Sequence, residues 1–426
     1  MKMRHATASR IRARVSLSFL ALAVVTMSLI SCNVENTAIL PKITPLPVGA
    51  VNVPFVAQVP MEGVYEVVSG KERFGDVVAL RWRYRQLTIF ARDNYLILRS
   101  GLKDSSIYLQ GFWRVPTSDG NGTANFVIEK TQGTRALLRG FRPPSFSIKG
   151  KFGFGNEAPQ QNFELRFVRP FSASVTGRDF QIVGHRAGGR TSDRLPVSEN
   201  SIEMISFTEN YGSTGIEIDI RLTRDKVPVL YHDEDINIRL TVKGPINGPI
   251  GNFTYDQLNT FVRLIRGERI PKLEDALNYV VDSTRLEFVW LDMKEGRQAL
   301  DLVIPIQDKV LKRAQQKGRK LEVLVGIPTD DVLNDFKATP NFSSIPSLCE
   351  ISPEEARKLN SLAWAPRWTL GTQNDLVAQV QGEGRQVYCW TIDVPSYIEA
   401  FIRDGRFDGL LTNYPSIVAY YYYTQP

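Results

Sequence analysis

The feature that most constrains this chain is an alternation of short apolar runs and amphipathic stretches between about residue 180 and about residue 420. Alternating strands and helices are typical of parallel α/β folds, and about 240 residues suit a (β/α)₈ barrel of the TIM type. A doubly wound sheet is the alternative, but no GxGxxG sequence follows the first strand. The predicted barrel strands are residues 181–185, 215–220, 227–232, 286–294, 321–327, 361–366, 386–392 and 407–413.

Residues 58–175 have a different pattern and predict an all-β domain. Short runs rich in β-branched and aromatic residues are separated by turn residues, which favours an antiparallel sandwich or barrel. This segment contains neither His nor Cys, so we predict no catalytic site in it, and its ligand or partner is unknown. The predicted strands are Val78–Tyr84, Leu87–Arg92, Tyr95–Arg99, Ile107–Trp113, Ala124–Ile128, Phe146–Phe152 and Phe163–Phe167.

The first 31 residues are typical of a secretory signal. A basic segment is followed by the apolar run Leu17–Ile30, which is short for a membrane span. The sequence Leu29-Ile30-Ser31-Cys32 resembles a bacterial lipobox. We therefore expect Cys32 to carry acyl chains that hold an exported protein at the surface of a cell-envelope membrane, periplasmic or exposed. A cleaved signal with a nearby Cys is the alternative.

Residues 32–57 are then a proline-containing linker, and residues 176–426 the catalytic barrel. The net charge of +7 is concentrated in the signal segment, where five basic residues precede Leu17. Because the excess charge does not belong to a folded domain, we predict no nucleic-acid partner. The other cysteines, Cys349 and Cys389, are expected to be buried thiols, with a disulfide as the alternative.

Outside the signal segment the chain has two histidines, His185 and His232, and each follows a predicted strand. A single histidine is more often structural than catalytic. Two histidines at strand ends in the same part of a barrel favour proton transfer, because the carboxyl ends of barrel strands form the active site.

Carboxylates accompany the histidines on neighbouring strands. Glu217 and Asp219 are two residues apart and therefore face the same side of one strand, and Asp292 and Lys294 have the same spacing on another. Two carboxylates on an interior face repel each other unless a cation or a proton lies between them. Oxygen ligands favour one hard divalent ion, Ca²⁺ or Mg²⁺. The carboxylates with such an ion, together with the cations Arg186 and Lys294, indicate a site for a phosphoester.

Five short motifs in sequence order resemble the opening of the glycerophosphodiester phosphodiesterase family, whose pattern is HRG, EN(T/S), ExD, TxD and HD. They are Gly184-His185-Arg186, Glu199-Asn200-Ser201, Glu217-Ile218-Asp219, Thr223-Arg224-Asp225 and His232-Asp233. Further matches are residues 270–277 (IPKLEDAL), Trp390-Thr391, and Asp408-Gly409 with residues 412–415 (TNYP). The resemblance covers about residues 181–416 and says nothing about the preceding domain.

The resemblance implies metal-dependent hydrolysis of glycerophosphodiesters to glycerol 3-phosphate and an alcohol. It implies that the substrate's 2-hydroxyl attacks phosphorus and that water then opens a cyclic phosphate. The implied roles are acid and base catalysis for His185 and His232, metal binding for Glu217, Asp219 and Asp292, and substrate or phosphate binding for Arg186, Lys294, Glu199 and Trp390.

This chain departs from the family pattern at Ala187, where HRG has Gly, at Asp292, where the family usually has Glu, and at Asp393, where WTxN has Asn. A shorter carboxylate at position 292 changes the reach of a metal ligand. Two other functions remain open. A related barrel of the phospholipase C or D type could act on lipid or envelope-polymer phosphodiesters, or the chain could be a binding lipoprotein without activity.

Overall fold

The computed structural model describes residues 40–426. The predicted signal segment and Cys32 lie outside the described residues. No helix in the described part of the chain is both long and apolar enough to cross a membrane.

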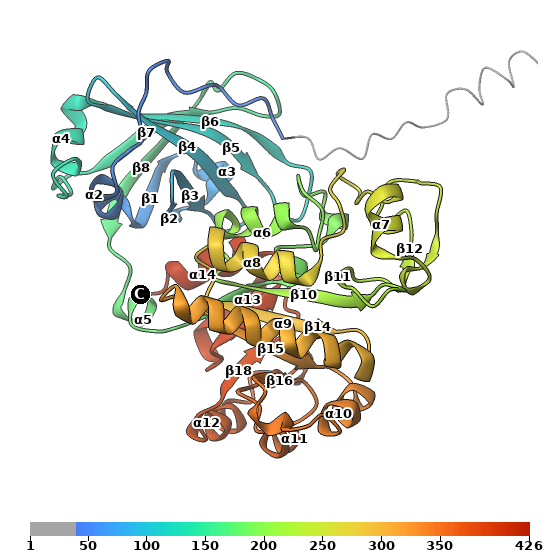
Figure 1. Cartoon of the computed structure of the whole chain (residues 1–426). Coiled ribbons are helices and arrows are strands. Elements are labelled where there is room, and N and C mark those ends of the chain that lie inside the picture. Colours follow the sequence, from blue (N-terminus) through green and yellow to red (C-terminus); the bar gives the residue numbers. More distant parts are fainter. Residues whose placement is uncertain (1–39) are drawn as a thin grey trace, which may run out of the picture. The chain divides into compact units, whose positions relative to one another are not determined.

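The first folded region is a closed antiparallel barrel of eight strands (Figure 1). The sequence predicted seven of these strands and missed the first, β1, which closes the barrel by pairing with β8. Large apolar side chains fill the interior, among them Tyr65, Trp113 and Phe126. Val53 and Ala57, which the sequence placed in the linker, also pack against this core. The strands are β1 (Gly63–Ser69), β2 (Val77–Arg83), β3 (Gln86–Phe90), β4 (Tyr95–Lys103), β5 (Ser106–Arg114), β6 (Asn121–Ile128), β7 (Ser147–Phe152) and β8 (Gln161–Arg169), and the helices are α2 (Phe55–Gln58), α3 (Lys71–Phe74), α4 (Thr134–Leu137) and α5 (Ala173–Thr176).

The second region is a closed parallel barrel of eight strands, as the alternation predicted. Its ring runs β9, β10, β14, β15, β16, β17, β18 and β19, and β9 pairs with β10 to close it. The ring strands are β9 (Gln181–Gly184), β10 (Gly215–Leu222), β14 (Phe288–Met293), β15 (Glu322–Ile327), β16 (Ser347–Cys349), β17 (Ala363–Trp364), β18 (Gln386–Cys389) and β19 (Gly409–Thr412).

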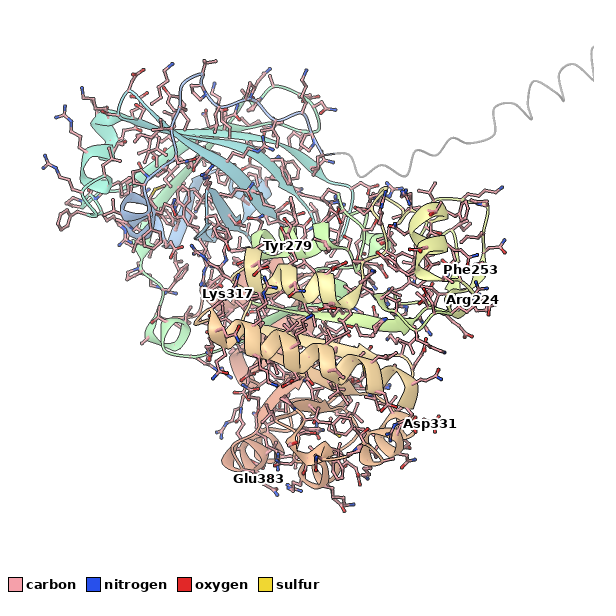
Figure 2. The ribbon with its side chains drawn as sticks, viewed as in Figure 1. Arg224, Phe253, Tyr279, Lys317, Asp331 and Glu383 are labelled. Carbon is pink, nitrogen blue, oxygen red and sulfur yellow. The ribbon has the colours of Figure 1, made fainter. Side chains whose placement is uncertain are left out.

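Helices surround this ring. Helices α8 and α9 lie side by side on its outer surface (Figure 1), and Tyr279 of α8 and Lys317 at the end of α9 are labelled in Figure 2. An ion pair of 2.6 Å between Arg313 and Asp282 connects the two helices. The surrounding helices are α6 (Ile202–Thr208), α8 (Leu273–Ser283), α9 (Arg297–Gln316), α10 (Asp330–Lys337), α11 (Pro353–Leu359), α12 (Asn374–Gly382), α13 (Pro395–Asp404) and α14 (Pro415–Tyr423). Helix α7 (Tyr255–Phe261) lies in the excursion that follows β11 (Pro228–Leu230) and packs against residues of that excursion.

One predicted barrel strand was wrong. Residues 227–232 contain β11 (Pro228–Leu230), which runs antiparallel to β10 and lies outside the ring. The missing place in the ring is taken by β16, a strand of three residues that the sequence analysis did not detect. The remaining short strands, β12 (Asp235–Ile236) and β13 (Gly248–Pro249), form a separate pair in the excursion that follows β11.

Alternation along β10 and β14 decides which side chains face the inside of the parallel barrel. Ile216 and Ile218 of β10 belong to the core between strands and helices, whereas Phe288 and Trp290 of β14 belong to the core inside the ring. Because side chains alternate along a strand, Glu217, Asp219 and Asp292 point to the interior. The parallel register then pairs Asp219 with Asp292.

The two barrels share an apolar contact. Phe90 and Tyr95 of the first barrel belong to the same buried cluster as Tyr211 and Tyr423 of the second. The rings of Tyr95 and Tyr211 meet edge to face with centroids 5.3 Å apart. The cysteines Cys349 and Cys389 are buried free thiols, as expected from the sequence.

Candidate active site

The two predicted histidines and the three predicted acids converge at the carboxyl ends of the parallel strands. His185 opens a short 3₁₀ helix (His185–Ala187) directly after β9, and His232 follows β11. Both line a cavity of about 450 Å³ with Glu217, Asp292 and Lys294. Arg186 and Trp390 line it as well. His232 therefore reaches the site from an antiparallel hairpin that extends β10, and not from a barrel strand of its own.

The three carboxylates form a compact cluster. Glu217, Asp219 and Asp292 each have an oxygen atom within 4.8 Å of the others. Oε1 of Glu217 and Oδ1 of Asp292 are buried and have no hydrogen-bond partner in the described part of the chain. Burial raises the pKa of both side chains, and neighbouring carboxylates raise it further. Buried carboxylate oxygens that repel one another and lack hydrogen bonds are ligands that a hard divalent cation would stabilise.

Lys294 lies among these acids. Its Nζ is 2.9 Å from Oδ1 of Asp219 and 2.5 Å from Oδ2 of Asp292. Burial alone would lower the pKa of Lys294, but Asp219, Asp292 and Glu217 raise it above its usual value. Burial likewise opposes ionisation of Asp219, but Lys294 and then the two histidines lower the pKa of Asp219 to about 2. The ammonium group is therefore charged beside the acids.

A hydrogen-bonded chain sets the protonation of His185. Oδ1 and Oδ2 of Asp393 accept hydrogen bonds from the backbone N and the Nδ2 of Asn413, at 2.8 Å and 2.6 Å. Since the amide NH₂ of Asn413 faces Asp393, its Oδ1 faces Nδ1 of His185 at 2.9 Å. An amide oxygen only accepts, so Nδ1 of His185 carries the proton and Nε2 is left as the acceptor of the neutral ring.

The neutral form of His185 is the favoured one. Burial, and then the adjacent Arg186, lower the pKa of His185 to about 4. Nε2 lies 3.7 Å from Oε2 of Glu217. A neutral ring with an available Nε2 can accept a proton at neutral pH.

His232 is oriented by the residue that follows it. Its Nδ1 lies 2.7 Å from Oδ1 of Asp233, whose other oxygen accepts hydrogen bonds from Asn237 and Arg239. Because a carboxylate accepts hydrogen bonds, Nδ1 of His232 carries a proton and Nε2 is again left for chemistry.

Arg186 and Glu199 form a buried ion pair. Nη1 of Arg186 lies 2.7 Å from Oε1 of Glu199, and Oε2 of Glu199 accepts a hydrogen bond of 2.7 Å from the backbone N of Thr191. Arg186 has φ of 53°, and its backbone N donates to Oε2 of Glu217. Glu199 is not among the residues that line the cavity, and its link to the site is the ion pair with Arg186.

Asn200 joins the neighbouring strand to this loop. Its Nδ2 donates to Oδ2 of Asp219 at 2.6 Å, and its Oδ1 accepts from the backbone N of Asp219. Trp390 is fixed in the wall of the cavity by a hydrogen bond of 2.8 Å from its Nε1 to the carbonyl of Ala365. The guanidinium of Arg367 stacks on the same indole, with Cζ 4.8 Å from the ring centroid.

Glu350 is a further acid of the cavity that the sequence analysis missed. It follows β16, and its buried Oε1 has no hydrogen-bond partner within residues 40–426. Burial, and then Asp292, raise the pKa of Glu350, while Lys294 and Arg367 oppose this shift. Only recognition of the short strand before it could have placed this residue at the site.

Comparison with known proteins agrees on one family. The model described as "Glycerophosphoryl diester phosphodiesterase family" matches residues 185–417. A glycerophosphodiester phosphodiesterase of Caldanaerobacter subterraneus is 25% identical over 244 residues, a match that covers 55% of this chain and 94% of the relative. A probable glycerophosphodiester phosphodiesterase 2 of Mycobacterium tuberculosis is 29% identical over 255 residues, covering 54% of this chain and 86% of the relative.

Solved structures match a similar share of the chain. A glycerophosphodiester phosphodiesterase from Parabacteroides distasonis has 24% sequence identity and a TM-score of 0.44, and it covers 57% of this chain and 95% of its own. An Oleispira antarctica phosphodiesterase, solved with the product sn-glycerol-3-phosphate, has 20% identity and a TM-score of 0.45 over 56% of this chain and 94% of its own.

Proposed function

This chain belongs to the glycerophosphoryl diester phosphodiesterase family and is a phosphoric diester hydrolase, and we propose that it hydrolyses glycerophosphodiesters with one divalent cation and two histidines. The products are glycerol 3-phosphate and an alcohol. The observation that carries the proposal is the convergence of His185 and His232 on one cavity with Glu217 and Asp292, which form a compact acid cluster with Asp219.

The acids fit a divalent cation. Glu217, Asp219 and Asp292 supply only oxygen atoms, and two of these atoms are buried without a partner among the described residues. Such a set suits Ca²⁺ or Mg²⁺. Bound there, the cation would neutralise phosphate charge and acidify a coordinated hydroxyl.

The histidines divide the proton transfers. His185 is neutral and presents Nε2 to the cavity, so it is placed to accept the proton of the attacking hydroxyl group. His232, oriented by Asp233, is placed to donate a proton to the leaving oxygen when its ring is protonated. Acid and base catalysis of this kind contribute roughly 10²–10⁴-fold each.

The cations of the site hold the phosphate. Lys294 and Arg186 both line the cavity. The ammonium of Lys294 lies beside Asp219 and Asp292, and the guanidinium of Arg186 pairs with Glu199. A substrate phosphate carries negative charge that both side chains attract. The indole of Trp390 offers an apolar wall for the glycerol carbons.

The position at the membrane is part of the proposal. The apolar run Leu17–Ile30 followed by Cys32 supports an exported lipoprotein anchored to the cell envelope. The proposed substrates are then small or lipid-derived phosphodiesters that reach a membrane surface.

The test is the release of glycerol 3-phosphate from glycerophosphocholine and glycerophosphoethanolamine. It is run with Ca²⁺, Mg²⁺ or EDTA on the wild type, His185→Ala and His232→Ala. Phe141→Ala removes a ring that is 67% exposed on the first barrel and serves as the control. We expect metal-dependent release that falls at least about 100-fold in both histidine variants and is unchanged in the control. Folded protein without activity under any of these conditions contradicts the proposal and directs attention to lipid or polymer diesters.

A further inference from the structure

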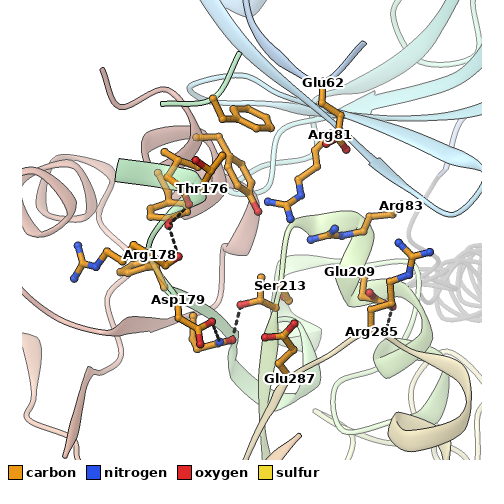
Figure 3. Close-up of a pocket in the computed structure, with 17 residues that line it drawn as sticks. Glu62, Arg81, Arg83, Thr176, Arg178, Asp179, Glu209, Ser213, Arg285 and Glu287 are labelled. Carbon is orange, nitrogen blue, oxygen red and sulfur yellow. Dashed lines mark hydrogen bonds between the residues drawn. The ribbon is translucent and has the colours of Figure 1, made fainter. Parts of the chain in front are cut away.

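A second cavity, of about 410 Å³, lies between the first barrel and the amino-terminal ends of the parallel strands (Figure 3). On the side of the parallel strands it is lined by residues that immediately precede or begin β9, β10 and β14, namely residues 179–181, residues 213–214, Arg285 and Glu287. His185 follows the other end of β9, and Asp219 and Asp292 lie near the other ends of β10 and β14. This cavity is therefore separate from the candidate active site.

Two arginines of β2 face this cavity. Arg81 and Arg83 are two residues apart on one strand and so share a face, and both guanidinium groups point into the cavity in Figure 3. Arg81 stacks on the ring of Tyr423, with Cζ 4.7 Å from the centroid. Within residues 40–426, Nε of Arg83 is buried without a hydrogen-bond partner. Burial, and then the neighbouring Arg81, lower the pKa of Arg83.

The carboxylates around the cavity have other partners. Oε1 of Glu62 accepts a hydrogen bond of 2.8 Å from the backbone N of Trp82. Oε2 of Glu209 accepts one of 3.2 Å from the backbone N of Arg285. Asp179 and Glu287 both pair with Lys320. Among the described residues neither Arg81 nor Arg83 forms an ion pair, although the charges of Glu209 and Glu62 attract Arg83 from the cavity wall.

The rest of the lining is partly apolar. Val175, Phe180, Tyr422 and Tyr423 are buried side chains of the cavity wall. A volume of this size lies within the range of small-molecule sites, about 300–1,000 Å³. Partly buried cations are costly unless an anion compensates them, and paired guanidinium groups match the oxygens of phosphate and carboxylate.

We propose that this cavity binds a small organic oxyanion, a phosphate or carboxylate with a short apolar part, through Arg81 and Arg83. The bound anion contacts β2 of the first barrel and the ends of the parallel strands of the second. Its binding therefore stabilises the junction between the barrels without taking part in catalysis.

The test measures phosphate binding and melting temperature in the full-length chain. The variants are Arg83→Gln and the double substitution Arg81→Gln/Arg83→Gln. Arg99→Gln is the matched control, because Arg99 is an exposed arginine of β4 that does not line the cavity. We expect isothermal titration with inorganic phosphate to give one binding site fewer in the double variant than in the wild type. The dissociation constant for phosphate at this site should rise by roughly tenfold or more in the single variant. Glycerophosphodiester turnover should be unchanged.

The melting temperature separates an anion site from a structural pair of arginines. In buffer without phosphate, Arg83→Gln should melt at or above the wild-type temperature, because it removes a guanidinium whose buried Nε has no hydrogen-bond partner within residues 40–426. Added phosphate should then raise the melting temperature of the wild type and Arg99→Gln more than that of the arginine variants. Equal phosphate effects in all variants, or a lower melting temperature of Arg83→Gln in phosphate-free buffer, would overturn the proposal. Glycerol 3-phosphate and succinate, compared in the same assay, identify which oxyanion class binds more tightly.

Discussion

The hydrogen-bonded chain from Asp393 through Asn413 to His185 predicts a specific pattern of coupling between two substitutions. In the wild type the Asp393 carboxylate accepts from the Asn413 amide, and this fixes the direction in which that amide presents its oxygen to His185. The perturbation is to exchange the two residues, first singly and then together. Each single change should disturb the chain, and the exchange should repair it.

Asp393→Asn alone replaces one accepting oxygen by an NH₂ group. The new NH₂ group at position 393 then faces one of the N–H or O–H groups of residues 412–413 that Asp393 accepted from. The clash is avoided only if the Asn413 amide turns and points its own NH₂ at Nδ1 of His185. A turned amide forces the proton from Nδ1 to Nε2, which removes the acceptor from the cavity. Asn413→Asp alone places two carboxylates where a hydrogen bond of 2.6 Å existed. One of them must then be protonated or move away.

The size of each effect follows from the bonds at stake. A hydrogen bond to a charged group contributes about 1.5–3 kcal/mol, and an unpaired buried donor costs about 1–3 kcal/mol. If most of this appears in the barrier, each single variant loses roughly 10–100-fold in kcat/KM. In Asp393→Asn/Asn413→Asp the carboxylate introduced at position 413 accepts from both the amide introduced at position 393 and Nδ1 of His185, so the tautomer is restored. We expect a coupling free energy of at least about 1.5 kcal/mol, in the upper part of the usual range for interacting residues.

The assay is kcat/KM for glycerophosphocholine at saturating metal for the four proteins of this cycle. Thermal melting of the same samples shows whether each variant is folded. The reasoning would be refuted if the losses of the two single variants simply added in the double variant, with a coupling free energy below about 0.5 kcal/mol. Additive losses would mean that the hydrogen-bonded chain does not set the tautomer of His185.

Three further predictions concern the site and its stability. Glu199→Gln leaves Arg186 as a buried charge without its ionic partner, so urea titration should show a free energy of unfolding lower by roughly 3–5 kcal/mol; an unchanged unfolding midpoint contradicts this. Glu217→Gln removes an acid of the proposed metal site, so the rise in melting temperature on adding Ca²⁺ or Mg²⁺ should be lost, whereas the wild type should lose it only in EDTA. In EDTA, the unfolded chain binds a proton on His185 at higher pH than the folded chain, because the folded pKa is lowered to about 4. Stability should therefore fall as pH decreases from about 6.5 to about 4, by at most about 3 kcal/mol, and His185→Gln should show a smaller fall over the same interval.

Much of the site could be predicted from the sequence because it depends on residues that are close together in the chain. Spacing of two residues places Glu217 and Asp219 on one face of a strand whatever the rest of the fold does. The alternation of apolar and amphipathic stretches predicted the parallel barrel, and with it the end of the strands at which His185 lies. The family resemblance came from residues that are adjacent in short motifs, and the comparisons confirmed it.

Other features depended on strand pairing that no local pattern specifies. Residues 227–232 have the apolar character of a barrel strand, but hydrogen bonds to β10 make β11 an antiparallel extension. Conversely, β16 has only two consecutive apolar residues, Leu348 and Cys349, whereas the even shorter β17 lies in the longer apolar run Leu362–Ala365. The position of β16 in the ring comes from its two neighbours. Glu350 was missed for the same reason.

The class of fold, the acids of one strand and the two histidines outside the signal segment could all be recognised in the amino-acid sequence. The side chains that meet across long separations became visible only when the chain was folded. His185 and Asn413 are 228 positions apart, yet their hydrogen bond sets the histidine tautomer. Arg81 and Arg83 look like ordinary surface residues of a β-strand until the second barrel encloses them. Such contacts arise from packing of distant elements, whereas sequence periodicity reports only the local environment of each element.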